Sequence, residues 1–180
     1  MTAGTVDASI DPAVLGDAET ATLQGATLTL RPARGRDFRR LLDLTRSVAT
    51  GSRQSQPPSA ARELVADSRI HRWNNGTGRV VYVATVDGRV CGWAHVTTVP
   101  ETGGRLAKLS GGVAGRFRGE GIGSRLLQYV LDRSLTREHG RVYQHIPAGD
   151  DDAFQFLRMH GWHVEACGTD SDELRVVQDV

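Results

Sequence analysis

The sequence has few cysteines, few aromatic residues and almost no net charge. Cys91 and Cys167 are the only cysteines in 180 residues, which argues against a disulfide-rich scaffold or a cysteine-based metal site. Basic and acidic residues number 22 and 21, giving a net charge of +1, so nothing global favours binding to nucleic acid or to an anionic membrane. Because Cys91 lies in an apolar run, we expect a buried, reduced thiol and no metal.

Long apolar runs are also missing. No stretch approaches the roughly 18 residues that a membrane-spanning helix needs, and the first residues lack the charged and apolar regions of a signal peptide. We therefore expect a soluble, cytoplasmic protein that binds neither membrane nor nucleic acid. With 39% hydrophobic residues, the chain is long enough for one well-cored domain and too short for two.

Glycine, by contrast, is concentrated in a segment that opens a predicted helix. Gly119, Gly121 and Gly123 follow a strand-like run that ends at Val113. The helix is predicted by apolar residues that fall on one face: Ile122, Leu126, Leu127, Val130 and Leu131. Glycines leave backbone N–H groups unshielded at the positive end of a helix, an arrangement that suits phosphate.

Two common phosphate-binding loops do not match this segment. A Walker A loop requires a Gly-Lys pair, which the chain lacks. The dinucleotide fingerprint requires a third glycine where this chain has Ser124, and it follows the first strand of a βαβ unit rather than lying past mid-chain. The segment does contain Arg118-x-x-Gly121-x-Gly123, a short pattern that also fits a plain glycine-rich turn before a helix.

From Ala26 onward, the pattern predicts alternating strands and helices. Strands are expected at 27–30, 79–86, 89–96, 106–113, 141–146, 163–167 and 174–177. Helices are expected at 38–51, 59–70, 152–160 and from Ile122. Asp87-Gly88 predicts a hairpin turn between two strands. Residues 1–25 carry acidic but no basic residues, which predicts a flexible arm, with a short helix at 11–20 as the alternative.

This order of elements resembles the GNAT superfamily of N-acetyltransferases over roughly 155 residues. Residues 86–93 resemble the family's hairpin, and Arg118 to Gly123 resemble its pyrophosphate-binding loop. A third motif resembles Ala-x-x-x-Tyr-x-x-x-Gly-Phe and consists of Ala153, Leu157, Gly161 and Trp162. The resemblance implies one α/β (α+β) domain over 26–180, with a mixed, mostly antiparallel sheet of six to seven strands flanked by about four helices.

The resemblance also implies an enzyme that transfers an acetyl group from acetyl-CoA to a primary amine of a small molecule or protein. The acetyl-CoA-binding residues that it implies are Gly111, Val113, Ala114, Gly115, Arg118, Gly119, Glu120, Gly121, Ile122, Gly123 and Ser124. Strands 106–113 and 141–146 would splay to admit the thioester. A homodimer is left open by the resemblance.

Candidates for the general base are few. An amine with a lysine-like pKa of about 10.4 must lose a proton before it attacks. Relatives often carry a glutamate on the strand where this chain has residues 108–110, Lys-Leu-Ser. His145 is therefore the first candidate, Asp150 the second, and Glu101 and His95 the remaining ones. Asp150 also fits a helix N-cap, and a strand histidine also fits simple local hydrogen bonding.

Leu157 occupies the position at which relatives usually have a tyrosine that protonates the departing CoA thiolate. Leucine has no proton to give, although general-acid help is worth only about 10²- to 10⁴-fold. The alternative to an enzyme is thus a silent acyl-CoA-binding module with a sensing or scaffolding role, and a longer acyl-CoA is a third reading. The acceptor is expected near segments 47–75 and 97–104, where Glu101 or Trp73 could contact an amine; the alternative for Trp73 is a packing role.

Overall fold

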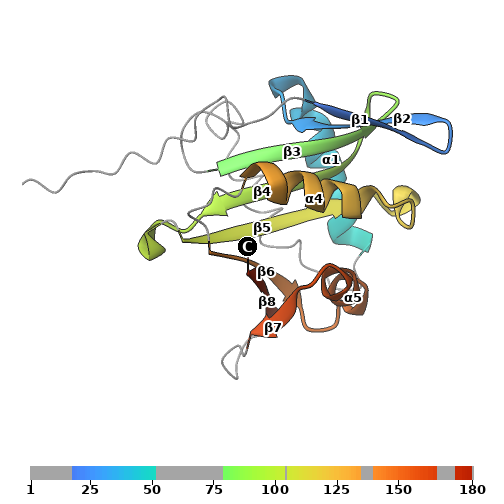
Figure 1. The fold of residues 1–180 in the computed structure, drawn as a ribbon. Helices are drawn as coiled ribbons and strands as arrows, with labels where there is room; N and C mark the ends of the chain where they lie inside the picture. The colour runs from blue at the N-terminus through green and yellow to red at the C-terminus, as the bar shows by residue number, and fades with distance from the viewer. Residues whose placement is uncertain (1–17, 52–78, 104, 135–139, 166–172, 180) are drawn as a thin grey trace, which may run out of the picture.

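An eight-stranded sheet organises the protein in the computed structural model, which describes residues 18–51, 79–103, 105–134, 140–165 and 173–179. The strand order is β1-β2-β3-β4-β5-β6-β8-β7 (Figure 1). The strands are β1 (Glu19–Leu23), β2 (Ala26–Pro32), β3 (Arg79–Val86), β4 (Arg89–Thr98), β5 (Leu106–Val113), β6 (Arg141–Pro147), β7 (His163–Glu165) and β8 (Glu173–Asp179). All neighbouring strands are antiparallel except β5 and β6, which run parallel.

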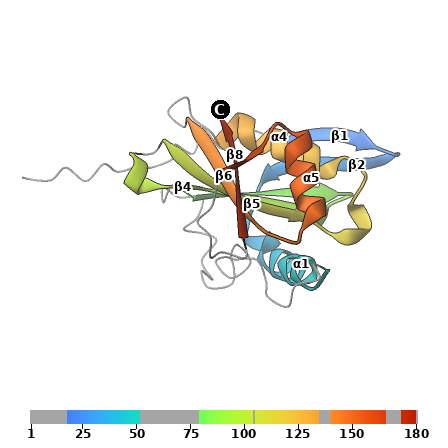
Figure 2. The same ribbon diagram turned by 90° about the horizontal axis from the view of Figure 1, so that it is seen from below.

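Helices cover both faces of the sheet. The α-helices are α1 (Phe38–Gly51), α4 (Ile122–Ser134) and α5 (Asp151–Met159), and the 3-10 turns are η2 (Gly35–Asp37), η3 (Pro100–Thr102) and η4 (Gly115–Phe117). Helix α1 lies on one face, while α4 and α5 lie on the other (Figure 2). None of the helices in the described ranges is long and apolar enough to cross a membrane.

The predicted fold is confirmed, with one more strand than expected. The additional strand is β1, whose residues 19–23 pair with β2 through the turn at Gln24 and Gly25. The sequence analysis placed this segment in a flexible arm, and for residues 19–25 the structure replaces that arm with a strand and a turn. The rest of the arm and the predicted helix at 59–70 lie outside the described residues.

Strand β3 is buried on both faces, which explains its continuous apolar run. Tyr82 faces α4, where its ring meets that of Tyr129 edge-on at 5.5 Å between centroids. Val81 and Val83 face α1 and pack with Trp93 of β4 in a second core. Since successive side chains of a strand point to opposite faces, one strand contributes to both cores.

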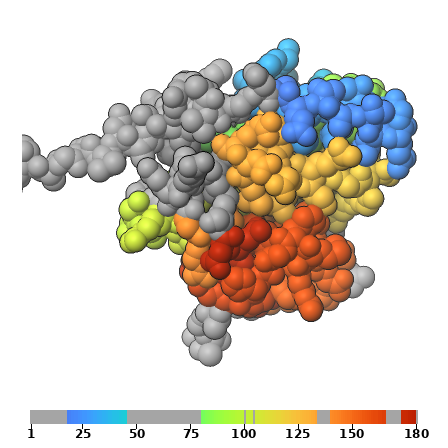
Figure 3. Space-filling model, viewed as in Figure 1, coloured from blue at the N-terminus to red at the C-terminus, as the bar shows by residue number. Residues whose placement is uncertain are grey.

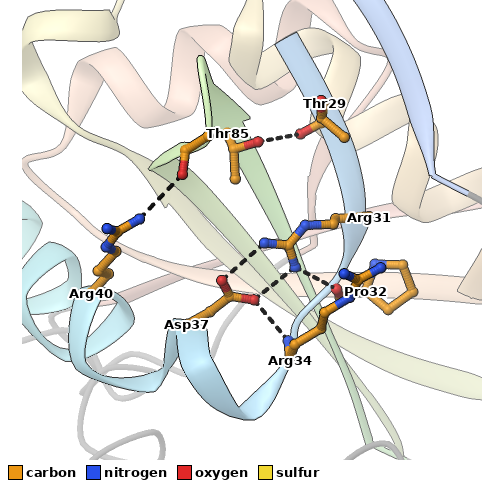
Figure 4. A network of polar contacts seen from close by, with 8 residues as sticks. Thr29, Arg31, Pro32, Arg34, Asp37, Arg40 and Thr85 are labelled. Carbon is orange, nitrogen blue, oxygen red and sulfur yellow. Dashed lines mark hydrogen bonds and ion pairs between the residues drawn. The ribbon is translucent and has the colours of Figure 1, made fainter.

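An ion pair fixes the junction between β2 and α1 (Figure 4). Two nitrogens of Arg31 bind the two carboxylate oxygens of Asp37 at 2.7 and 2.9 Å, and the Arg34 backbone N–H donates to the same carboxylate at 2.8 Å. Burial alone would raise the pKa of Asp37, but the hydrogen bonds from Arg31 and Arg34 and the charges of Arg31 and Arg36 lower it overall. Asp37 is therefore ionised at neutral pH.

Candidate functional site

The centre of the sheet opens between β5 and β6. These strands pair only at their first residues, ending with Lys108 opposite Tyr143. Beyond that point β6 remains paired with β8 along its full length, and β5 remains paired with β4. Residues 109–113 therefore have a strand edge with no strand partner, as the sequence analysis expected. Open backbone donors and acceptors of this kind suit an extended ligand.

A glycine pair keeps the open edge of β5 free of side chains. Gly111 is exposed, and a Cβ atom built on it would lie only 2.7 Å from the backbone oxygen of Trp93. Any other residue at this position would thus push β5 away from β4. Gly112 follows directly, so the strand borders the opening with its backbone alone.

After β5 the chain makes a loop rich in unpaired amides. Gly119 and Gly121 have φ values of +81° and +74°, a region that favours glycine. None of the backbone N–H groups from residues 119 to 124 donates to a backbone oxygen of another described residue. The first helical bond joins the Arg125 N–H to the Gly121 oxygen at 3.1 Å. The loop and the α4 N-terminus together present a row of backbone N–H groups, an arrangement that suits an anion.

Arginines give this loop a positive field. The Nε atom of Arg118 donates to the Val113 oxygen at 3.3 Å, which ties the loop back to the end of β5. The Arg116 guanidinium lies 4.8 Å from the centre of the Phe117 ring. Both arginines and Arg125 are exposed, so their charges face solvent at the mouth of the loop.

Two neighbouring elements hold the loop from either side. A Cβ atom on Gly123 would lie 3.4 Å from the ring of Phe156, so the start of α4 packs closely against α5. On the other side, Gln24 donates to Glu120 at 2.5 Å from the β1–β2 turn. In Figure 3 the yellow loop residues lie between the blue β1–β2 hairpin and the orange-red α5.

The side chains or backbone of three predicted ligand-binding residues anchor the loop, and the role of these residues toward a ligand stays a prediction. Ile122 is 1% exposed and belongs to the core under α4. The Ala114 N–H donates to the Cys91 oxygen at 2.8 Å, and its side chain packs against the core under α1. Gly115 is exposed at the start of η4. These residues fix the path of the chain between β5 and the loop.

Polar residues cross the face of the sheet that α1 covers, beside the opening. We call this set the polar stripe, and it comprises His95, Lys108, Ser110, Tyr143 and His145. The register explains the grouping, because His95 lies opposite Ser110 and Lys108 opposite Tyr143, and paired residues share a face. The sequence analysis named two of these residues as base candidates, and the structure brings both to one face.

His145 lies on the part of β6 that is no longer paired with β5. Its side chain is 38% exposed, and its Nδ1 atom lies 3.2 Å from an oxygen of Glu173 on β8. The rings of His145 and Tyr143 are 5.4 Å apart. Sequence reasoning missed Glu173, because only the register between β6 and β8 brings it to His145.

The other base candidates are placed differently. His95 is only 4% exposed, and its Nε2 atom lies 3.0 Å from the hydroxyl of Thr97. Asp150 is the N-cap of α5 and accepts the Ala153 N–H at 3.1 Å, which is the alternative that the sequence left open; its catalytic role stays a prediction. Glu101 is exposed in η3.

Leu157 is 3% exposed and packs in the core between the sheet and the helices α4 and α5. Cys91 is a buried free thiol, as predicted, and burial raises its pKa to about 11. Within the described ranges, no group of three or more His, Cys, Asp or Glu side chains is arranged to hold a metal ion. Trp73 and Cys167 lie outside these ranges.

Comparison with known proteins supplies the family context for this site. Residues 40–162 match the model of the acetyltransferase (GNAT) family. A search of curated proteins found no match.

Solved structures share the fold at low sequence identity. The GNAT domain of PAT from S. lividans is 17% identical, with a TM-score of 0.71 over 91% of this chain and 97% of that chain. A ribosomal-protein-alanine N-acetyltransferase from Brucella melitensis is 22% identical, with a TM-score of 0.64 over 84% and 99% of the two chains. A phosphinothricin acetyltransferase from Sinorhizobium meliloti, solved with acetyl-CoA, is 24% identical, with a TM-score of 0.65 over 85% and 88%.

Proposed function

Because the chain belongs to the GNAT family of acetyltransferases, with acetyl-CoA as its co-substrate, we propose that it transfers the acetyl group directly to a primary amine. The acceptor is an amine of a small molecule or of a protein. The observation that carries this proposal is the continuity of two open features, the edge of β5 at 109–113 and the unpaired amides at 119–124. Together they match a ligand that has an extended arm joined to a pyrophosphate.

Each part of acetyl-CoA has a counterpart in the site. The amides of residues 119–124, at the positive end of α4, would bind the pyrophosphate. The open edge of β5 would accept hydrogen bonds from, and donate them to, the amide groups of the pantetheine arm. The acetyl group would then lie toward the point where β5 and β6 meet, next to Lys108 and Tyr143.

The acceptor amine approaches from the polar stripe in this proposal. His145 is the general base, because it is exposed on the part of β6 that is no longer paired with β5 and a neutral imidazole nitrogen can accept a proton. Asp150 is a weaker candidate for this role, since its carboxylate already accepts the Ala153 N–H.

A second candidate function is a catalytically silent module that binds acetyl-CoA. Leu157 favours it, because this core side chain has no hydroxyl to protonate a thiolate. Turnover separates the two functions. An enzyme releases CoA thiol in proportion to added amine, whereas a silent module binds acetyl-CoA and releases none.

The experiment is calorimetric titration with acetyl-CoA, followed by thiol release with glycine, methionine, lysine, spermidine and an alanine-starting peptide. The test variant is Ser124→Glu, which places a carboxylate in the first turn of α4. A carboxylate there stabilises the helix but repels pyrophosphate. We expect acetyl-CoA affinity to fall at least about tenfold without a lower melting temperature.

Gln155→Glu is the matched control, because it adds the same charge to an exposed position of α5. Its affinity for acetyl-CoA should equal that of the wild type. Equal affinity of the Ser124→Glu variant and the wild type would contradict the assignment of the loop, and absence of acetyl-CoA binding by the wild type would contradict the proposed function.

A further inference from the structure

Neither of the two places at which relatives carry a proton-transferring glutamate or tyrosine holds that residue here. Strand β5 presents Lys108, Leu109 and Ser110 where it meets the opening, and α5 presents Leu157 to the core. A protonated amine loses two protons when it becomes an amide: one goes to solvent before attack, and the second leaves the nitrogen during acetyl transfer while the CoA sulfur gains one. A histidine that is held by a carboxylate can take a proton from nitrogen and then give it to sulfur.

His145 and Glu173 form the exposed histidine–carboxylate pair beside the opening. Strands β6 and β8 pair without interruption from Arg141 to Pro147, which fixes both backbones. His145 lies opposite Arg175, and Glu173 lies opposite Pro147, two residues along the same face. The resulting distance between Nδ1 and the carboxylate oxygen is 3.2 Å.

Glu173 is the carboxylate that contacts His145, while the neighbouring Glu165 contacts Arg175. Arg175 has its guanidinium 4.4 Å from the centre of the Tyr143 ring, and its Nε atom lies 3.2 Å from an oxygen of Glu165. Lys108 lies opposite Tyr143, which is two residues before His145 on β6. The other charged groups described on β6 and β8 are Arg141 and Asp179, which lie opposite each other at the far end of the two strands with 3.1 Å between their side-chain atoms.

The tautomer of His145 follows from this contact. Ionised Glu173 accepts a hydrogen bond and donates none, so Nδ1 carries the hydrogen and Nε2 keeps its lone pair. Nε2 is then free to accept a proton in the resting state. The same logic orients histidine bases in other acyl-transfer enzymes, where the carboxylate also stabilises the imidazolium.

We propose that His145 and Glu173 are a single dyad that first removes a proton from the amine nitrogen and then delivers it to the CoA sulfur. This inference rests on the proposed function. The ammonium first loses one proton to solvent, and the neutral amine nitrogen then bonds to the acetyl carbon while Nε2 of His145 takes the second proton from nitrogen. The carbon–sulfur bond then breaks, and the imidazolium returns that proton to the thiolate. The products are the amide and CoA thiol, and His145 is neutral again.

In this scheme His145 is the catalytic residue and Glu173 is a positioning residue. One group serves as base and then as acid, so no tyrosine is needed at position 157. The dyad also explains how an enzyme of this fold works without a carboxylate at residues 108–110.

The test compares His145→Gln and Glu173→Gln with two acceptors, the panel amine with the fastest wild-type turnover and hydroxylamine. Hydroxylamine is largely unprotonated at neutral pH, so its attack depends little on a base. We expect His145→Gln to lower kcat with the panel amine by about 10²- to 10⁴-fold and with hydroxylamine by a smaller factor, because with that acceptor the main loss is the return of the proton to sulfur. The affinity for acetyl-CoA should not change.

Glu173→Gln should lower kcat about tenfold with an unchanged KM for acetyl-CoA. When kcat of this variant is plotted against pH, its rise with pH should occur at lower pH than in the wild type. The reason is that the imidazolium of His145 loses a neighbouring negative charge. The double variant should be no slower than His145→Gln, as residues that act as a unit are not additive.

His163→Gln is the matched control, since this histidine is exposed on β7; it should keep the wild-type rates. If His145→Gln keeps its rate with the panel amine, or loses both acceptors equally, the dyad is overturned while the proposed function stands. If the wild type releases no CoA with any amine, both proposals are overturned.

Discussion

Asp37 carries its charge inside the protein, with only 4% of the residue exposed. Its two-pronged contact with Arg31 and its bond from the Arg34 backbone connect the end of β2 to the start of α1. Charge-assisted bonds of this kind are among the stronger ones in proteins. The ion pair therefore fixes the position of the α1 N-terminus relative to the end of β2.

Asp37→Asn should destabilise the protein by about 3 kcal/mol, because it leaves the Arg31 charge buried without its partner. The pKa of Asp37 in the folded state lies below its ordinary value of 3.8. The stabilisation is thus complete above that value and is lost as the pH falls through the lower folded pKa. Urea unfolding at pH 7 and at pH 3 measures both effects.

Asp43→Asn is the control for this experiment, since Asp43 is an exposed residue of the same helix. Its free energy of unfolding should remain within about 0.5 kcal/mol of the wild type. A loss of stability in Asp37→Asn no greater than that of the control would show that the ion pair contributes little.

At the scale of elements, the β1–β2 hairpin supports the glycine loop. Gln24 has a φ of +47°, which is unusual for a residue with a side chain. Its amide reaches Glu120 across 96 positions of sequence. The contact holds the acidic side chain of Glu120 against the hairpin.

Gln24→Ala should weaken acetyl-CoA binding about two- to fivefold, because Glu120 is then free to approach the phosphates and exposed contacts of this kind are worth up to about 1 kcal/mol. Calorimetric titration measures the change. Thr22→Ala, at an exposed position of β1, should bind acetyl-CoA as the wild type does. Restored affinity in Gln24→Ala/Glu120→Gln would identify the carboxylate as the cause, and equal affinity of all variants would refute the idea.

Local patterns predicted most elements, and the exceptions depend on distant contacts. Strands β3 and β4 are rich in β-branched residues and are joined by Asp87-Gly88, so they were evident from the sequence. Strand β1 was not, because its short polar sequence gains its order from pairing with β2 and from Glu19 lying 3.6 Å from Arg133 of α4.

The site divides in the same way. The loop at 119–124 was predicted because its glycines and the helix that follows are adjacent in sequence. The pairing of His145 with Glu173 was not, because it depends on the register of two strands 28 residues apart, and register follows from the packed sheet rather than from local pattern.

For the whole molecule, the short junction between β5 and β6 divides the sheet into two parts. Strands β1–β5 form one part and β6–β8 the other, and only residues 106–108 of β5 pair across the division. Acetyl-CoA bound to the open edge of β5 would form hydrogen bonds with the backbone groups of β5 that have no partner on β6.

Hydrogen exchange should detect this effect. With acetyl-CoA at 100 times its Kd, the stabilisation of the folded state is about 2.7 kcal/mol. Amides of residues 109–113 and 119–124 should show the largest added protection, and those of β2, which is distant from the opening, the least. Equal protection everywhere would indicate that the ligand binds without contacting the opening.

The position of β8 has a consequence for the order in which the protein assembles. Strand β7 precedes β8 in the chain but lies outside it in the sheet, with β8 between β6 and β7. In the described sheet β7 pairs only with β8, so during synthesis this pairing cannot form before residues 173–179 have been made. The same residues bring Glu173 to His145, so the proposed proton carrier is complete only once β8 has paired with β6.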